Sequence, residues 1–304
     1  MEAEISGVLT VNKPAGMTSH DVVGRIRKLY MTRRVGHTGT LDPMATGVLV
    51  ILIGRAAKAS EYLVRNSKRY LATLRLGITT DTEDTTGSIL TQCETIPDYG
   101  ALCEVLPRFR GTILQTPPMY SALKVGGKKL VDLAREGKTV ERTPRPIEIF
   151  SLEAFPTSVR EEYRLDVSCS GGTYIRTLCA DIGAALGCGG AMASLERTEA
   201  CGFPIEKAHT LTELEEMTFE ERAALLAPTE SLFADLKAVR LPAFYEKLCR
   251  SGCEIYLSKL GITLACLEKV RILDGKGEFF ALGEVREYEK GLAIKAIKTF
   301  LLNE

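Results

Sequence analysis

The spacing of apolar and polar residues predicts a mixture of strands and helices in the first 80 residues. Residues 7–13 (GVLTVNK) suit a short strand, and residues 48–53 (VLVILI) form a continuous apolar run typical of a central strand. Residues 68–77 alternate apolar with other side chains, which predicts a half-buried strand. Ser19 is expected to cap a helix whose apolar residues fall at helical spacing. These residues are Val22, Val23, Ile26 and Leu29.

The middle of the chain is more polar and carries turn signals. Residues 79–87 (TTDTEDTTG) predict a polar loop, and residues 98–106 predict a short helix that ends before a proline. Residues 115–146 are basic and contain several prolines and glycines, so we expect them to form an excursion from the sheet.

Strands return after this excursion. Residues 145–155 and 162–170 are expected to be strands, and residues 171–176 (GGTYIR) open a helix for which Thr173 is the expected cap. Strands and helices therefore mix without regular βαβ alternation. This pattern indicates the α+β class.

The last part of the chain has a different character. After Pro228, short strand-like segments separated by glycines predict a small β-rich domain that begins at about Phe233. The expected organisation is a domain at 1–232, which carries the excursion at about 115–146, and a second domain at 233–304.

Composition excludes several classes of protein. Among 304 residues, 45% are hydrophobic and 26% are charged, which is typical of a packed globular protein. No apolar stretch is long enough to span a bilayer and the first residues are acidic, so we expect a cytoplasmic protein without a membrane partner. Nine cysteines form no C-x-x-C pair, and the three histidines have no metal-site spacing, so no metal is expected. Phosphate-binding loops, dinucleotide fingerprints and nucleophile elbows are also missing from the sequence.

Charge is unevenly distributed although the formal net charge is zero. Residues 1–150 contain 21 Lys and Arg against 15 Asp and Glu, a net charge of +6, and the remaining residues carry −6 because both totals are 39. Runs of Lys and Arg usually form a solvated face. Two basic segments within a positive half make a surface that contacts phosphates an equally good interpretation.

Three residues are candidates for chemistry. Asp42 lies in a loop rich in glycine at 36–47, where Pro43 disfavours helical backbone, although Asp-Pro in such a loop is more often a simple turn. Arg176 falls in the first turn of its helix, where the dipole disfavours a cation. It therefore needs a carboxylate partner such as Asp42, or a structural ion pair elsewhere. Tyr70 faces the apolar side of its strand and is by pattern a core residue.

Several motifs resemble those of the TruB family of tRNA pseudouridine synthases. The loop GHTGTLDPMATGVL at 36–49 is similar to the signature loop of that family, and most of the chain takes part in the resemblance. The other matching motifs are NKPAGMTS at 12–19, KRY at 68–70, QTPPMYSALK at 115–124 and GTYIRT at 172–177. The resemblance implies a pseudouridine synthase fold, with a mixed, mainly antiparallel sheet flanked by helices. It also implies a C-terminal PUA-like domain that binds RNA.

The resemblance also implies roles for individual residues. Asp42 would be the catalytic carboxylate, Arg176 its ion-pair partner and Tyr70 the ring that stacks on the target uracil. The further residues implied to bind or support the RNA substrate are His37, Lys13, Tyr174, Leu195, Lys124, Lys128 and Lys129, with Pro14 beside Lys13 supporting the loop. Glu199 and Cys201 depart from the family pattern, which more often has a non-acidic residue and glycine there.

The function implied is isomerisation of uridine 55 in the T loop of tRNA to pseudouridine. This reaction needs no redox change, so no cofactor is expected, and the partner is the T arm of tRNA with no obligate protein partner and a monomeric enzyme. Two alternatives remain: a tRNA-binding or folding chaperone, and a pseudouridine synthase that acts on another RNA, with or without a guide RNA.

Overall fold

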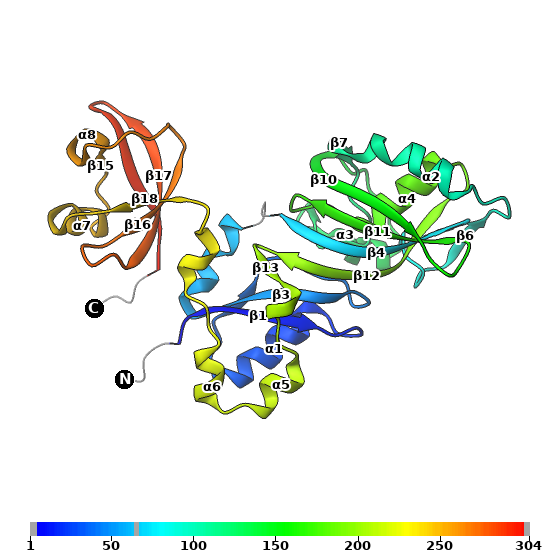
Figure 1. Ribbon diagram of the computed structural model, residues 1–304, viewed down its shortest axis with the longest axis horizontal. Coiled ribbons are helices and arrows are strands. Elements are labelled where there is room, and N and C mark those ends of the chain that lie inside the picture. The colour runs from blue at the N-terminus through cyan, green and yellow to red at the C-terminus, as the bar shows by residue number, and fades with distance from the viewer. Residues whose placement is uncertain (1–4, 64–66, 301–304) are drawn as a thin grey trace.

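A large mixed sheet forms the body of the protein in the computed structural model, which describes residues 5–63 and 67–300 (Figure 1). Its main strands lie in the order β1-β3-β12-β4-β11-β10-β7, with β2 on β3 and β13 on β12. Among the residues described, only the β3–β12 pairing within it is parallel. The mixed, mainly antiparallel sheet of an α+β protein is therefore confirmed. The strands are β1 (Gly7–Lys13), β2 (Val35–His37), β3 (Thr46–Ile53), β4 (Lys68–Leu76), β7 (Gly111–Gln115), β10 (Arg145–Pro156), β11 (Glu162–Cys169), β12 (Gly190–Ala200) and β13 (Phe203–Pro204).

Helices cover different parts of this sheet. Helix α1 (Ser19–Leu29) packs with α5 (Leu211–Glu216) against β1 and β3, whereas α4 (Ile175–Ala185) and α2 (Tyr99–Val105) cover β4, β10 and β11 (Figure 1). The expected cap of α1 is off by one residue, because Thr18 rather than Ser19 forms a capping box with Asp21. Ser19 instead points inward and bonds to the loop that carries Asp42. The remaining helices of this part are α6 (Phe219–Ala224) and the 3₁₀ helices η1 (Gly54–Tyr62), η2 (Leu106–Phe109), η3 (Ile205–Lys207) and η4 (Thr229–Phe233).

The basic segment at 115–146 leaves the sheet and returns to it, as predicted. Strands β7 and β10 are antiparallel neighbours, and Gln115 at the end of β7 pairs with Arg145 at the start of β10. The residues between them form a small hairpin, β8 (Lys124–Val125) and β9 (Lys128–Lys129), followed by α3 (Leu130–Arg135). We call residues 116–144 the insertion.

A second, five-stranded sheet follows the main sheet in sequence, with the order β14-β16-β17-β18-β15. The expectation that glycines separate the strands of this part is wrong at Gly283, because β17 continues through it. A Cβ atom there would lie 2.7 Å from a side-chain carbon of Ile272 and 2.8 Å from one of Ile294, so the packed neighbours leave room only for glycine. The elements are β14 (Lys237–Arg240), α7 (Ala243–Arg250), β15 (Ile255–Tyr256), α8 (Leu257–Leu260), β16 (Lys269–Leu273), β17 (Phe279–Tyr288) and β18 (Gly291–Thr299).

One apolar cluster joins the two sheets. Phe279 stacks on Phe300, Phe233 lies tilted against both rings, and all three pack together with residues of β3 and η1. At the edge of this contact the Tyr62 hydroxyl donates to the Ile297 carbonyl at 3.2 Å. The C-terminal sheet is thus fixed to the main body by a buried joint. Across the described residues, no helix combines the length and apolar character needed to cross a membrane.

Candidate active site

A cavity of about 390 Å³ lies where β4 and β12 meet the loop after β2, the insertion and the first turn of α4. Its wall contains six of the residues predicted from sequence: Asp42, Tyr70, Lys129, Tyr174, Arg176 and Leu195. Segments that are far apart in the chain therefore supply one site.

Asp42 is held on a loop that is tied down on both sides. On one side, the Ser19 hydroxyl accepts from the Leu41 amide at 2.9 Å and donates to the Leu41 carbonyl at 3.2 Å. On the other side, the Lys13 ammonium donates to the Pro43 carbonyl at 3.2 Å. Lys13 is fully buried and also donates to the carbonyls of Pro14 and Met17, so it supports this loop rather than reaching the solvent. A direct contact of Lys13 with RNA is thus disfavoured by the geometry, whereas the supporting role is favoured.

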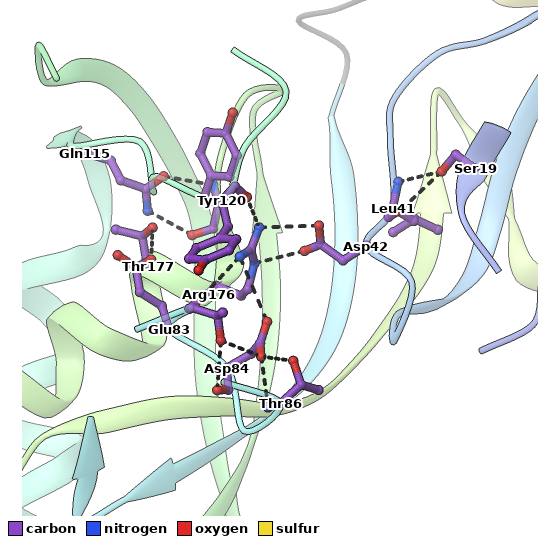
Figure 2. Close-up of polar contacts among 12 residues, drawn as sticks. Ser19, Leu41, Asp42, Glu83, Asp84, Thr86, Gln115, Tyr120, Arg176 and Thr177 are labelled. Carbon is purple, nitrogen blue, oxygen red and sulfur yellow. Dashed lines mark hydrogen bonds and ion pairs between the residues drawn. The ribbon is translucent and has the colours of Figure 1, made fainter. Parts of the chain in front are cut away.

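Arg176 pairs directly with Asp42 at the wall of the cavity (Figure 2). The Nε atom lies 2.9 Å from Asp42 Oδ2, and Nη2 lies 3.3 Å from Asp42 Oδ1, so the pairing is bidentate. The remaining donors of the guanidinium reach the Tyr120 carbonyl at 2.8 Å and the Thr82 carbonyl at 3.0 Å. Arg176 is 5% exposed. This buried cation is therefore fixed by three other segments of the chain, and the pairing proposed from its place in the helix is confirmed in the structure.

The sequence analysis missed a second carboxylate at this site, Asp84. Its Oδ2 lies 3.9 Å from Arg176 Nη1, and its Oδ1 accepts from the Thr86 amide at 2.9 Å and the Thr82 hydroxyl at 2.8 Å. Figure 2 shows Asp84 and Thr86 below the Arg176 guanidinium. Asp84 is buried, so residues 79–87 are not merely a polar loop. Alternating Thr and Asp residues are typical of exposed turns, and no pattern within this segment indicates its burial.

The electrostatic environment of Asp42 combines opposing effects. Burial raises the pKa of the Asp42 carboxyl above its ordinary value, and this effect exceeds the lowering caused by the Arg176 guanidinium. The negative charge of Asp84 adds to the rise, and Lys13 opposes it. Asp42 nevertheless keeps access to the cavity, because 35% of its side chain is exposed. The site thus holds a carboxylate that is partly desolvated, oriented and reachable.

Arg197 also lines the cavity, and it is a second residue that the sequence analysis did not select. Arg197 is 1% exposed, and it donates to the Val48 carbonyl at 2.6 Å and to the Gly39 carbonyl at 3.1 Å. At Gly47, whose φ is 97°, a Cβ would lie 2.3 Å from the Arg197 carbonyl oxygen, so only glycine allows this approach. Tyr70 lies beside Arg197; burial raises the pKa of the Tyr70 hydroxyl, and Arg197 acts against that rise.

The other predicted residues His37, Lys124 and Lys128 do not border the cavity. His37 is partly buried next to His20, with ring centroids 6.4 Å apart, and burial lowers its pKa. Lys124 and Lys128 are exposed on the hairpin of the insertion. Cys201, which departs from the family motif, has a φ of 54° in the turn between β12 and β13. That positive φ is a physical reason for the preference for glycine at this position.

The family is decided by comparison with known proteins. Residues 27–175 match the model of the TruB family pseudouridylate synthase (N terminal domain), and residues 176–234 match that of the tRNA pseudouridylate synthase B C-terminal domain. The chain is 47% identical to tRNA pseudouridine synthase B of Francisella philomiragia subsp. philomiragia over 233 residues, which are 76% of this chain and 77% of that protein. It is 46% identical, with the same coverage, to tRNA pseudouridine synthase B of Francisella tularensis subsp. tularensis. The chain belongs to the TruB family.

Solved structures confirm the fold of this TruB-family chain over nearly its whole length. A chain in the structure of an H/ACA RNP bound to a substrate RNA containing 2′-deoxyuridine matches with a TM-score of 0.73, covering 97% of this chain and 85% of that chain at 24% identity. A chain of a Cbf5-Nop10-Gar1 complex matches with a TM-score of 0.71, covering 98% and 85% at 24% identity. At such identity the comparison shows the fold alone.

Proposed function

We propose that this chain isomerises a uridine of tRNA to pseudouridine, with uridine 55 of the T loop as the target and Asp42 as the catalytic carboxylate. The observation that carries the proposal is the bidentate pairing of Asp42 with Arg176 at the wall of a cavity that also contains Tyr70 and Leu195. Relatives that are 46–47% identical are named tRNA pseudouridine synthase B.

The reaction requires one well-placed carboxylate. The bond from N1 of uracil to C1′ of the ribose breaks, the base turns while it stays bound, and a bond from C5 to C1′ forms. The C5 proton passes to solvent, N1 gains a proton, and no electrons are exchanged. Asp42 can attack C1′, attack C6 of the ring, or remove a ribose proton toward a glycal. Each route needs Asp42 ionised and held still, which is what Arg176 and the ties of the loop provide.

The walls of the cavity suit an extruded base. A uridine within a folded RNA loop must unstack before it can react, and stacking on an aromatic ring compensates for this cost. Tyr70 supplies the ring and Leu195 an apolar surface, both on neighbouring strands β4 and β12. Tyr174 and Lys129 border the same cavity, which fits contacts with the flipped nucleotide and its phosphate.

We further propose a division of labour between the domains. The catalytic domain comprises residues 1–232, and residues 233–304 form the PUA-like domain that binds RNA away from the reacting base. Lys124, Lys128 and Lys129 of the insertion would contact phosphates of the T arm, and His37 would contact the loop. The protein would act in the cytoplasm as a monomer that needs no protein partner.

Two in vitro measurements and one cellular measurement test the function. The purified chain is incubated with tRNA transcripts labelled with tritium at C5 of uridine, and released tritium is measured. Pseudouridine is then mapped in the product and in RNA from cells with and without the protein. Tritium release from one T-loop position supports the proposal. Binding without release would favour the tRNA chaperone, and modification found only in other RNAs would favour a synthase with a different substrate.

A further inference from the structure

The first turn of α4 has no side-chain cap of its own. The residue at the cap position is Tyr174, and the expected cap Thr173 donates its hydroxyl to the Ser170 carbonyl at 2.9 Å instead. A helix start without a cap leaves backbone N–H groups in need of partners. Here one partner comes from another strand. The Tyr174 amide donates to Gln115 Oε1 at 2.8 Å, and Gln115 Nε2 donates to the Tyr174 carbonyl at 3.0 Å.

Gln115 occupies a particular place in the fold. It is the last residue of β7 and pairs with Arg145, the first residue of β10, so the insertion begins and ends at this pair. We call the pair of Gln115 and Arg145 the neck of the insertion. Gln115 is only 2% exposed, and both ends of its side-chain amide are used by Tyr174. Figure 2 shows Gln115 on the side of Arg176 opposite Asp42. A buried amide therefore joins the neck of the insertion to the helix that carries Arg176.

The insertion is fastened to the site a second time through Tyr120. Its carbonyl accepts from Arg176 Nη2 at 2.8 Å, and the same Nη2 atom lies 3.3 Å from Asp42 Oδ1. Arg176 is two residues beyond Tyr174, so a tilt of the first turn moves the guanidinium directly. A bidentate contact tolerates little displacement, because hydrogen bonds weaken steeply as distance and angle depart from ideal values.

We propose that Gln115 is a positioning residue: it locks the start of α4 to the neck of the insertion and thereby sets Arg176 against Asp42. This inference rests on the proposed function, in which Asp42 is the catalytic carboxylate. It gives the insertion a second role, because the segment proposed to bind RNA then also helps to position Arg176 against Asp42. Gln115 itself does not border the cavity.

Loss of the hydrogen bonds between Gln115 and Tyr174 should change the pKa of Asp42 as well as the reaction rate. The charged groups that act on Asp42 are Arg176 from α4, Asp84 from the loop after β5 (Ile78–Thr80), and Lys13 from β1. Of these, Arg176 has the largest effect and lowers the pKa of Asp42. A looser Arg176 therefore raises the pKa of Asp42 further, and the acidic limb of the rate profile moves to higher pH. Replacing a residue that only stabilises the fold would leave this acidic limb of the rate profile at the same pH.

The test compares Gln115→Met with Leu114→Ala. Methionine keeps the length and unbranched shape of glutamine but forms neither hydrogen bond, whereas Leu114 is 71% exposed on the same strand and serves as the control. Single-turnover rates of pseudouridine formation at saturating tRNA are measured from pH 4 to 9, together with the Kd for tRNA and the melting temperature. Gln115→Leu, which is also uncharged and also forms neither hydrogen bond, replaces the first variant if that variant does not fold.

We expect Gln115→Met to lower the single-turnover rate by about 10- to 100-fold, as a small misplacement of catalytic groups does, with Kd within about threefold of the parent. Its acidic limb should lie at higher pH, and Leu114→Ala should match the parent in every measurement. An unchanged rate and limb would overturn the proposal. A weaker Kd with the parent rate at saturation, or a lower rate with the parent limb, would overturn it as well.

An experiment without turnover separates this inference from the proposed function. The Asp42 carboxyl is titrated by NMR with ¹³C-labelled aspartate in the parent and in Gln115→Met, and its signal is assigned with Asp42→Asn. A higher pKa in Gln115→Met supports the lock even if the parent chain forms no pseudouridine. An equal pKa in the two proteins overturns the lock even if the parent chain is fully active.

Discussion

Replacing Asp42 by asparagine removes a charge while keeping nearly the same side-chain shape. In the parent, Asp42 accepts two hydrogen bonds from Arg176, at 2.9 and 3.3 Å. An amide can accept only one of them, because its NH₂ group would face a donor. Arg176 keeps its bonds to the carbonyls of Tyr120 and Thr82 and its proximity to Asp84, so the cation retains partners.

Stability and activity should therefore respond differently to Asp42→Asn. The pKa of Asp42 is raised in the folded protein, so ionisation of this carboxyl is less favourable in the folded chain than in the unfolded chain. Removing the charge offsets the lost hydrogen bond, and we expect the free energy of unfolding to change by no more than about 1 kcal/mol. The amide can act neither as a nucleophile nor as a base at neutral pH. The rate should fall by at least about 1,000-fold, which corresponds to roughly 4 kcal/mol of barrier.

The assay measures tritium release from C5-labelled tRNA under single-turnover conditions, alongside filter binding and thermal melting. Glu104→Gln, an exposed carboxylate on α2, is the matched control and should behave like the parent. Binding of tRNA by Asp42→Asn should be equal to the parent or tighter, because a carboxylate repels the RNA backbone. Residual turnover above about a tenth of the parent rate, a loss of under roughly 1.4 kcal/mol, would refute the assignment of Asp42.

Three further outcomes follow from the structure. The single-turnover rate of the parent should fall on acidification at a pH above the ordinary aspartate pKa of about 3.9. Burial raises the pKa of Asp42, and activity is lost as the pH falls through that pKa. A loss of rate that begins only at or below a pH of about 3.9 would contradict this. Replacing Lys124, Lys128 and Lys129 by alanine should reduce the slope of log Kd against log salt by up to about 2 to 3 units in filter binding, and an unchanged slope would remove the insertion from the interface. Ending the chain after Leu232 should lower the melting temperature and promote aggregation, because it removes Phe233, Phe279 and Phe300 from the joint with β3 and η1; an unchanged melting temperature would show that the joint contributes little.

Sequence periodicity predicted β3, β4 and the start of α4, because each has a strong local signal, but it predicted no strand at 190–200, where β12 carries Leu195 and Arg197. The alternation in residues 68–77 places Tyr70 and Lys68 on one face of β4, and the apolar run at 48–53 lies in β3, the neighbour of β1 and β12. The need of Arg176 for an anionic partner was also foreseeable, because the dipole disfavours a cation in the first turn of a helix, but Asp42 was only one of the partners that the residues left open. Its catalytic meaning came from the resemblance to the TruB family rather than from spacing.

The residues that were missed share one property: their roles depend on partners far away in the sequence. Asp84 is buried near Arg176 of α4, and Arg197 reaches Gly39, 158 positions away. Gln115 shows no periodic signal at all, since its function follows from the pairing of β7 with β10 and from the position of Tyr174. Thr18 and Ser19 were confused because either residue suits a cap, and the choice depends on the tertiary bonds of Ser19 to Leu41.

The placement of these long-range contacts ties catalysis to completion of the fold. Asp42 and Arg176 are 134 positions apart, and Arg176 takes carbonyls from segments 94 and 56 positions away. None of these buried charges is stabilised before the sheet has formed, because an unpaired buried charge costs several kcal/mol. The contacts of the Arg176 guanidinium with the loop of Asp42 and with the insertion must therefore form together, at the last stage of packing. A site built in this way holds its carboxylate in a partly desolvated state that no single element could maintain, which is the condition that the proposed chemistry requires.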